Sequence, residues 1–186
     1  MLPKDLHNAL VRITAEKSGT PVGTGFVCYQ DHDGTLILTC RLVLDMVADL
    51  TAPEVHPKRA VWIDGQYEAV PVFESERDVP IDLAVLKCAA APLRERPVLP
   101  LGQPLVMGET RIINYQSIRF SDTSRVTEKP LVYAYQLMSD SENELILRND
   151  SDFSIGADNI GSPVIDQNWV VGVVTRAAHV TSSRAK

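Results

Sequence analysis

Short apolar runs recur along the whole chain, and apolar and polar positions alternate within them at the period of two that is typical of β-strands. In the first half this pattern predicts strands over residues 9–14, 23–30, 34–40, 60–64, 68–74 and 82–88. In the second half it predicts strands over residues 110–115, 131–137, 144–148, 162–166 and 169–175. Strands this short and this evenly spaced indicate an all-β protein built as a sandwich or from barrels.

Two stretches depart from the strand pattern. The first ten residues and the segment LVLDMVADL (42–50) both favour helix. The strands at 23–30 and 34–40 flank the sequence DHDG, and an Asp-Gly pair between two such runs predicts a β-hairpin.

A proline-rich stretch divides the chain. The segment AAAPLRERPVLPLGQP (89–104) has four prolines and one glycine, which disfavour regular structure and predict a crossover linker. We therefore expect two six-stranded antiparallel β-barrels, one over residues 1–92 and one over residues 105–186, joined by a linker over residues 93–104. The polar tail HVTSSRAK allows this unit to be the N-terminal module of a longer protein.

Composition narrows the classes of function. The 186 residues have 45% hydrophobic content and a formal net charge of -6, without any basic run. We therefore expect neither nucleic-acid nor membrane binding. No apolar run approaches the ~20 residues of a spanning helix, and the start MLPKDLHNAL lacks a secretory signal pattern, so a bacterial-type cytoplasm is the expected compartment.

The cysteines give little indication of chemistry. Cys28, Cys40 and Cys88 make an odd count without metal-ligand spacing, so we expect no metal and no cofactor. Three reduced thiols in half-buried strands are the favoured interpretation, and a Cys28–Cys40 disulfide across the hairpin is the alternative.

Three segments carry a family resemblance. They are GTGFVCY with GTLILTCRLVL, then DVPIDLAVLK, then NDSDFSIGADNIGSPVI, and together they span about residues 8–176 in this order. This set resembles the trypsin-like serine proteases of the HtrA type, whose fold is a double β-barrel. The resemblance places Leu42 at the general-base position, Asp82 at the position that orients the base, and Ile160 at the nucleophile position. Asp158, Asn159 and Ile160 then form the former oxyanion loop.

These residue types cannot perform acyl transfer by a triad, which needs a nucleophile and a base within hydrogen-bond reach of it. Leu42 cannot take a proton, and Ile160 has no heteroatom to attack a carbonyl. Asp158 replaces the glycine that the family places in the oxyanion loop, and its carboxylate would repel the developing negative charge. Because loss of one oxyanion donor alone costs roughly 10²–10³ in rate, we expect a pseudoprotease with no catalytic residues.

Other residues are poor replacements for the lost triad. None of the histidines follows the family's spacing for a base; they are His7, His32, His56 and His179. Ser162 is interpreted as a tightly packed turn residue before Pro163. Cys40 would need a base to form a thiolate, and the sequence offers none.

Asp82 is expected to persist for structural reasons even without catalysis. The resemblance implies a buried carboxylate that accepts backbone hydrogen bonds, and such groups are costly to leave unpaired. Thr175, in the remnant of the segment that pairs with substrate, is a plausible hydroxyl partner. We expect Leu42, Asp82 and Ile160 to converge, with Leu42 and Ile160 forming an apolar plug in front of Asp82.

Three functions remain open at the level of sequence. The first is a non-catalytic module that binds a protein, a peptide or a neighbouring domain of the same longer chain. The resemblance implies such a context in bacterial multidomain signalling or defence proteins. The second is a working hydrolase with an unrecognised nucleophile. The third is a structural domain with a filled cleft.

Overall fold

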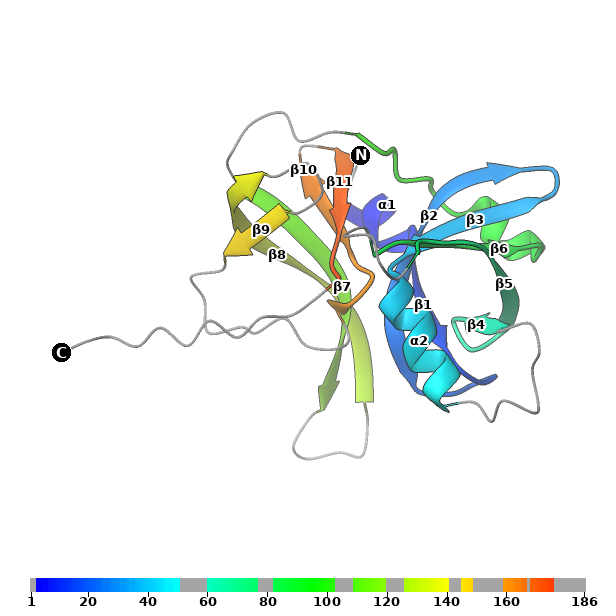
Figure 1. Ribbon diagram of the computed structural model, residues 1–186. Helices are drawn as coiled ribbons and strands as arrows, with labels where there is room; N and C mark the ends of the chain where they lie inside the picture. The colour runs from blue at the N-terminus through cyan, green and yellow to red at the C-terminus, as the bar shows by residue number, and fades with distance from the viewer. Residues whose placement is uncertain are drawn as a thin grey trace.

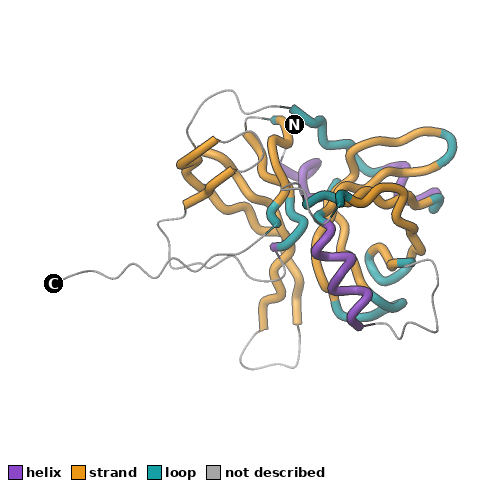
Figure 2. The backbone as a smooth tube through the Cα atoms, viewed as in Figure 1, coloured by secondary structure: helices purple, strands orange, loops and turns teal. Residues whose placement is uncertain are grey.

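The computed structural model describes residues 3–50, 60–76, 82–102, 109–119, 126–140, 145–148, 159–166 and 168–175. The described chain is mostly β-strand, with two α-helices and one 3-10 helix (Figure 2). Both helices lie where the sequence predicts them: α1 spans Pro3–Asn8 and α2 spans Arg41–Leu50. No described helix is long and apolar enough to cross a bilayer.

The first half forms a closed six-stranded barrel, as predicted (Figure 1). The strands pair around it in the order β1-β2-β3-β6-β5-β4. Their bounds are β1 (Leu10–Thr14), β2 (Pro21–Asp31), β3 (Gly34–Thr39), β4 (Val61–Ile63), β5 (Tyr67–Glu74) and β6 (Ala84–Cys88). Antiparallel pairing of Ile13 with Ile63 closes the barrel between β1 and β4. The predicted hairpin joins β2 to β3, with Asp31 opposite Gly34.

The second half contains a five-stranded antiparallel sheet in the order β11-β10-β7-β8-β9. Its strands are β7 (Glu109–Arg119), β8 (Val126–Asp140), β9 (Leu145–Arg148), β10 (Pro163–Asp166) and β11 (Trp169–Val173). All five match strands predicted from the alternating pattern. A sixth strand and closure into a second barrel are not seen within the described residues, and they stay a prediction.

The crossover between the halves is more regular than its prolines predict. The 3-10 helix η1 spans Ala91–Glu95 and has Pro92 in its first turn. Its Leu93 side chain is buried against the barrel core. The side-chain amide of Gln30 donates to the carbonyl oxygens of Leu93 and Arg96 at 2.8 and 2.9 Å. The crossover is therefore fixed to β2. The predicted boundaries at residues 92, 93, 104 and 105 stay predictions.

Two apolar clusters hold the described parts together. The larger fills the barrel and includes Ile13, Ile37 and Leu86. The smaller lies between the outer face of the barrel and the second half; its buried members are Leu6, Ala9, Leu10, Phe26, Leu99, Ile165 and Val170. Helix α1 contacts both β1 and β7, so it lies between the two halves (Figure 1).

Asp64 connects three parts of the first half. It lies in the turn between β4 and β5 with a φ of 53°, a left-handed conformation that aspartate tolerates better than most residues. Its Oδ1 accepts the Arg12 backbone N–H at 2.9 Å, and its Oδ2 accepts a hydrogen bond from the Arg96 guanidinium. Arg96 also donates to the Leu10 carbonyl oxygen at 2.8 Å. One half-buried carboxylate thus joins the turn, β1 and the crossover.

We expect Asp64→Asn to lower the free energy of unfolding by about 1–3 kcal/mol, because the amide keeps the turn conformation but removes the charge that pairs with Arg96. Urea unfolding followed by circular dichroism measures this change. Asp33→Asn is the control: the Asp33 side chain is 61% exposed, and its ion-pair partner among the described residues is His32, which is 89% exposed. That control should change stability by less than about 0.5 kcal/mol. Equal effects of the two substitutions would contradict the structural role of Asp64.

Candidate functional site

The first part of the candidate site lies at the start of α2. Strand β3 ends at Thr39, and the helix begins at Arg41 after the single connecting residue Cys40. Val43 and Val47 lie one turn apart and are buried in the barrel core, so the helix is held by its apolar face. Leu42 is half-buried and packs against the same core.

The structure brings Leu42 and Asp82 together although 40 residues separate them. The backbone N–H of Leu42 donates to Asp82 Oδ1 at 3.2 Å. The carboxylate therefore satisfies an N–H in the first turn of α2, which has no partner within the helix itself. This contact agrees with the expectation that Asp82 accepts a backbone hydrogen bond.

Arg41 is a second partner of Asp82 that sequence reasoning missed. Its Nε lies 3.9 Å from Asp82 Oδ1 and 3.6 Å from Asp45 Oδ2. Its Nη1 donates to the Ser75 carbonyl oxygen at 3.2 Å. The signal was present in TCRLVL, where a charged residue directly precedes the proposed base position. The expected hydroxyl partner, Thr175, lies half-buried after β11 and is not among the contacts of Asp82 in the described chain.

Ile160 lies in a tight turn directly before β10. The turn is closed by a hydrogen bond from the Ser162 N–H to the Asn159 carbonyl oxygen at 3.0 Å. The Ile160 side chain is 9% exposed and belongs to the apolar cluster against which Leu42 packs. Leu42 thus contacts Asp82 through its N–H and packs against the cluster that includes Ile160, and the convergence of all three residues stays a prediction. Asp158, the remaining residue of the proposed oxyanion loop, lies outside the described residues.

The same turn is fastened to β2 and to the end of β11. The Thr24 N–H donates to the Ile160 carbonyl oxygen at 2.8 Å, and the Gly161 N–H donates to the Val174 carbonyl oxygen at 2.8 Å. Gly161 has a φ of +85°, and a Cβ there would overlap the Thr24 carbonyl oxygen and the Thr39 hydroxyl. Only glycine meets both the conformational and the spatial requirement.

The alternative nucleophiles and bases are in unfavourable surroundings. Burial raises the pKa of the Cys40 thiol to about 12, with a smaller contribution from the negative charge of Asp82, so the thiolate is scarce at neutral pH. Ser162 is fully buried and its hydroxyl makes no hydrogen bond within the described chain. His7 lies in α1, where burial lowers its pKa. His32 is at the exposed hairpin tip, as predicted, and His56 and His179 lie outside the described residues.

All three cysteines are free thiols, in agreement with the favoured interpretation of the sequence. Cys88 is buried in β6 and Cys28 is half-buried in β2, but Cys40 lies in the connection to α2 rather than in a strand.

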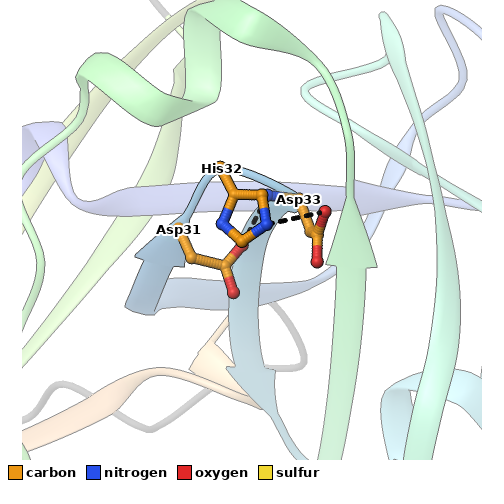
Figure 3. A group of neighbouring side chains, drawn as sticks. All are labelled: Asp31, His32 and Asp33. Atoms are coloured by element: carbon orange, nitrogen blue, oxygen red, sulfur yellow. Dashed lines mark hydrogen bonds and ion pairs between the residues drawn. The ribbon is translucent and has the colours of Figure 1, made fainter.

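One group of potential metal ligands lies at the tip of the β2–β3 hairpin. Asp31, His32 and Asp33 all lie on the surface, and their ligand atoms are within 4.8 Å of one another (Figure 3). The turn itself accounts for this grouping, because Asp31 Oδ1 accepts the backbone N–H groups of Asp33 and Gly34 at 2.8 and 3.0 Å. The geometry is that of a capped hairpin turn.

A pocket of about 260 Å³ opens elsewhere in the first half. Its lining comes from the end of α1 and from the crossover: Asn8, Pro92, Glu95, Arg96 and Pro97. None of these residues is a predicted site residue. The Arg96 guanidinium is already bound to Asp64 and to the Leu10 carbonyl oxygen.

A family model identifies the protein family to which the chain belongs. The family model for the trypsin-like peptidase domain matches residues 23–173, which include Leu42, Asp82 and Ile160. The chain belongs to this family. No curated protein matches it significantly.

Solved structures give the same fold. The crystal structure of Deg5 is similar with a TM-score of 0.60 and 21% identity, over 93% of this chain and 81% of Deg5. The serine endoprotease from Yersinia pestis matches with a TM-score of 0.55 and 20% identity, over 94% of this chain and 58% of that protein. The inactive form of the Rv3671c protease matches with a TM-score of 0.53 and 19% identity, over 96% and 82%. Identities this low show the fold of this trypsin-like domain and not its activity.

We expect Gly161→Ala to destabilise the domain by more than about 3 kcal/mol, because the methyl group adds a steric overlap to the strain of a positive φ. Gly65→Ala is the matched control. Gly65 also has a positive φ, of +66°, but a Cβ there would lie 3.0 Å from the Ser18 backbone. The control should cost less, about 1–2 kcal/mol, because it adds the conformational strain and a milder crowding against the Ser18 backbone. Urea unfolding of both variants measures the difference, and equal losses would show that the turn does not pack as described.

Proposed function

We propose that this trypsin-like domain is a pseudoprotease that binds a protein or peptide partner instead of cleaving it. The observation that carries the proposal is the packing of Leu42 and Ile160 with the apolar core, at the two positions that the resemblance assigns to base and nucleophile. Neither side chain can exchange a proton or attack a carbonyl. The surroundings of Cys40 and Ser162 support the proposal, because both groups are buried and Cys40 holds its proton.

Binding is the remaining use of such a site. A trypsin-like domain can still hold an extended peptide by strand addition and side-chain pockets without a triad. Leu42 keeps part of its surface accessible, whereas Ile160 is almost fully covered. A partner would therefore contact the rim around Leu42 rather than a deep floor. The partner can equally be a neighbouring domain of a longer chain, and the cytoplasm is the proposed compartment.

We further infer that the second half closes into a second six-stranded barrel. Five antiparallel strands in sequence-matched positions and the likeness to Deg5 support this.

The alternative is an active hydrolase with a non-standard nucleophile. We expect no casein cleavage and no labelling by a fluorophosphonate probe, under conditions in which an active trypsin-like protease is labelled. Leu42→His combined with Ile160→Ser should not restore turnover, because Asp158 still occupies the oxyanion loop. The same double variant should melt at a lower temperature than the parent, since replacing a buried isoleucine by a small polar residue costs about 2–5 kcal/mol.

Turnover by the parent chain, abolished by one substitution elsewhere, would contradict the pseudoprotease assignment. A melting temperature of the double variant equal to or above that of the parent would show that the two apolar side chains do not stabilise the fold.

Binding at the rim is tested with peptides selected from a random display library on the parent domain. We expect Leu42→Gln to weaken their binding at least ~10-fold, a loss of about 1.4 kcal/mol, because the few residues that carry most of the binding energy lie near the centre of an interface. Val72→Gln is the matched control, since Val72 is an apolar residue that is 53% exposed on β5. Isothermal titration calorimetry gives the affinities. Binding weakened by Val72→Gln and not by Leu42→Gln would place the partner on another surface.

A further inference from the structure

Asp82 is the one position of the proposed triad that still carries an ionisable side chain. The carboxylate is 17% exposed, and a charge at that depth is costly unless a partner compensates it. In a protease of this family, the resemblance implies that a histidine supplies that partner. Here the histidine is absent and the described cation beside Asp82 is Arg41.

The Arg41 guanidinium contacts three separate elements. Within α2 it pairs with Asp45; it approaches Asp82, two residues before β6; and it donates to the carbonyl oxygen of Ser75, directly after β5. Its own side chain is 17% exposed, so these contacts are largely shielded from water. One cation thus links the start of α2 to the neighbouring ends of two strands.

Ser75 extends this link to β6. Its N–H donates to the Leu83 carbonyl oxygen at 2.9 Å, and its Oγ accepts the Leu83 N–H at 3.1 Å. Leu83 follows Asp82 directly. Arg41 therefore bridges both sides of a hydrogen-bonded pair that joins the ends of β5 and β6.

Asp45 is the competing partner of Arg41. Its Oδ2 lies 3.6 Å from Arg41 Nε, whereas Asp82 Oδ1 lies 3.9 Å from the same atom. Burial decides in favour of Asp82. The Asp45 side chain is 27% exposed, and its pair with Arg41 is an i,i+4 contact, a type that stabilises helices weakly. Asp82 is less exposed and is also fixed by the Leu42 N–H, so its pairing with Arg41 is screened less by solvent.

We infer that Arg41 is a positioning residue that has taken the place of a histidine as the partner of Asp82. The acid no longer orients a base; it holds a cation that fixes α2 against the ends of β5 and β6. This inference rests on the proposed function in one respect, the assignment of Leu42 to the base position.

A double-mutant cycle in urea tests the pairing independently of that assignment. Arg41→Gln and Asp82→Asn keep hydrogen-bonding groups of similar size while removing the charges. Each should raise the unfolding equilibrium constant about 10-fold, and the double variant should stay within about 3-fold of the larger single effect. Asp33→Asn, at a side chain that is 61% exposed on the hairpin tip, is the control and should raise the constant about 2-fold or less. Independent effects whose product appears in the double variant, about 100-fold, would overturn the pairing.

A second measurement tests whether Arg41 stands in for the histidine. The imidazole introduced by Leu42→His is titrated by NMR in the presence and absence of Arg41→Gln. We expect its pKa to be about one unit higher when Arg41→Gln is present, because Asp82 is then free to pair with it. Adding Asp82→Asn should reduce that increase to the part that comes from loss of the neighbouring cation, and the difference measures the release of the acid.

An increase that is equally large with Asp82→Asn would overturn the replacement and the assignment of Leu42, while the cycle would still decide the Arg41–Asp82 pair. Labelling of the parent by fluorophosphonate would instead contradict the pseudoprotease assignment alone. The failures of the two proposals are therefore distinguishable.

Discussion

The hydrogen bond from the Thr24 N–H to the Ile160 carbonyl oxygen is the contact on which the arrangement of the candidate site depends. It joins β2 of the closed barrel to the turn that leads into β10. The approach is possible because both backbones lack side chains where they meet: a Cβ on Gly23 would lie 3.1 Å from the Ile160 carbonyl oxygen, and one on Gly161 would overlap Thr24. This contact holds Ile160 at the barrel core, against which Leu42 also packs.

Much of the fold follows from the local pattern of the sequence. Each strand that the alternation of apolar and polar residues predicts is present, and the Asp-Gly hairpin and both helices lie at their predicted places. These features depend on residues that are neighbours in the sequence, so the sequence alone predicts them. The regular crossover is different. Its η1 turn is stabilised by the amide of Gln30, a residue more than sixty positions earlier, and no local rule predicts that contact.

The candidate site divides in the same way. The positions of Leu42, Asp82 and Ile160 came from a family resemblance, which transfers residue by residue. The resemblance assigns no role to Arg41. Its role depends on contacts with Ser75 and Asp82, which lie 34 and 41 residues further along the chain. The family resemblance predicts Thr175 as a partner of Asp82, but the carboxylate contacts Arg41 and Leu42 instead. A partly buried acid at this position needs no histidine when another cation compensates its charge.

The first barrel draws all of its strands from residues 10–88, so it can close as soon as that length has left the ribosome. Its outer face cannot be completed at that time. Leu10 and Phe26 are fully buried in the finished protein, in a cluster that also contains Ile165 and Val170, and those two residues are made about eighty positions after the end of β6. At ~5–20 residues per second, a closed barrel whose outer apolar cluster is incomplete persists for several seconds on each nascent chain. During synthesis, the vulnerable species is therefore a half-built protein whose first barrel is already formed.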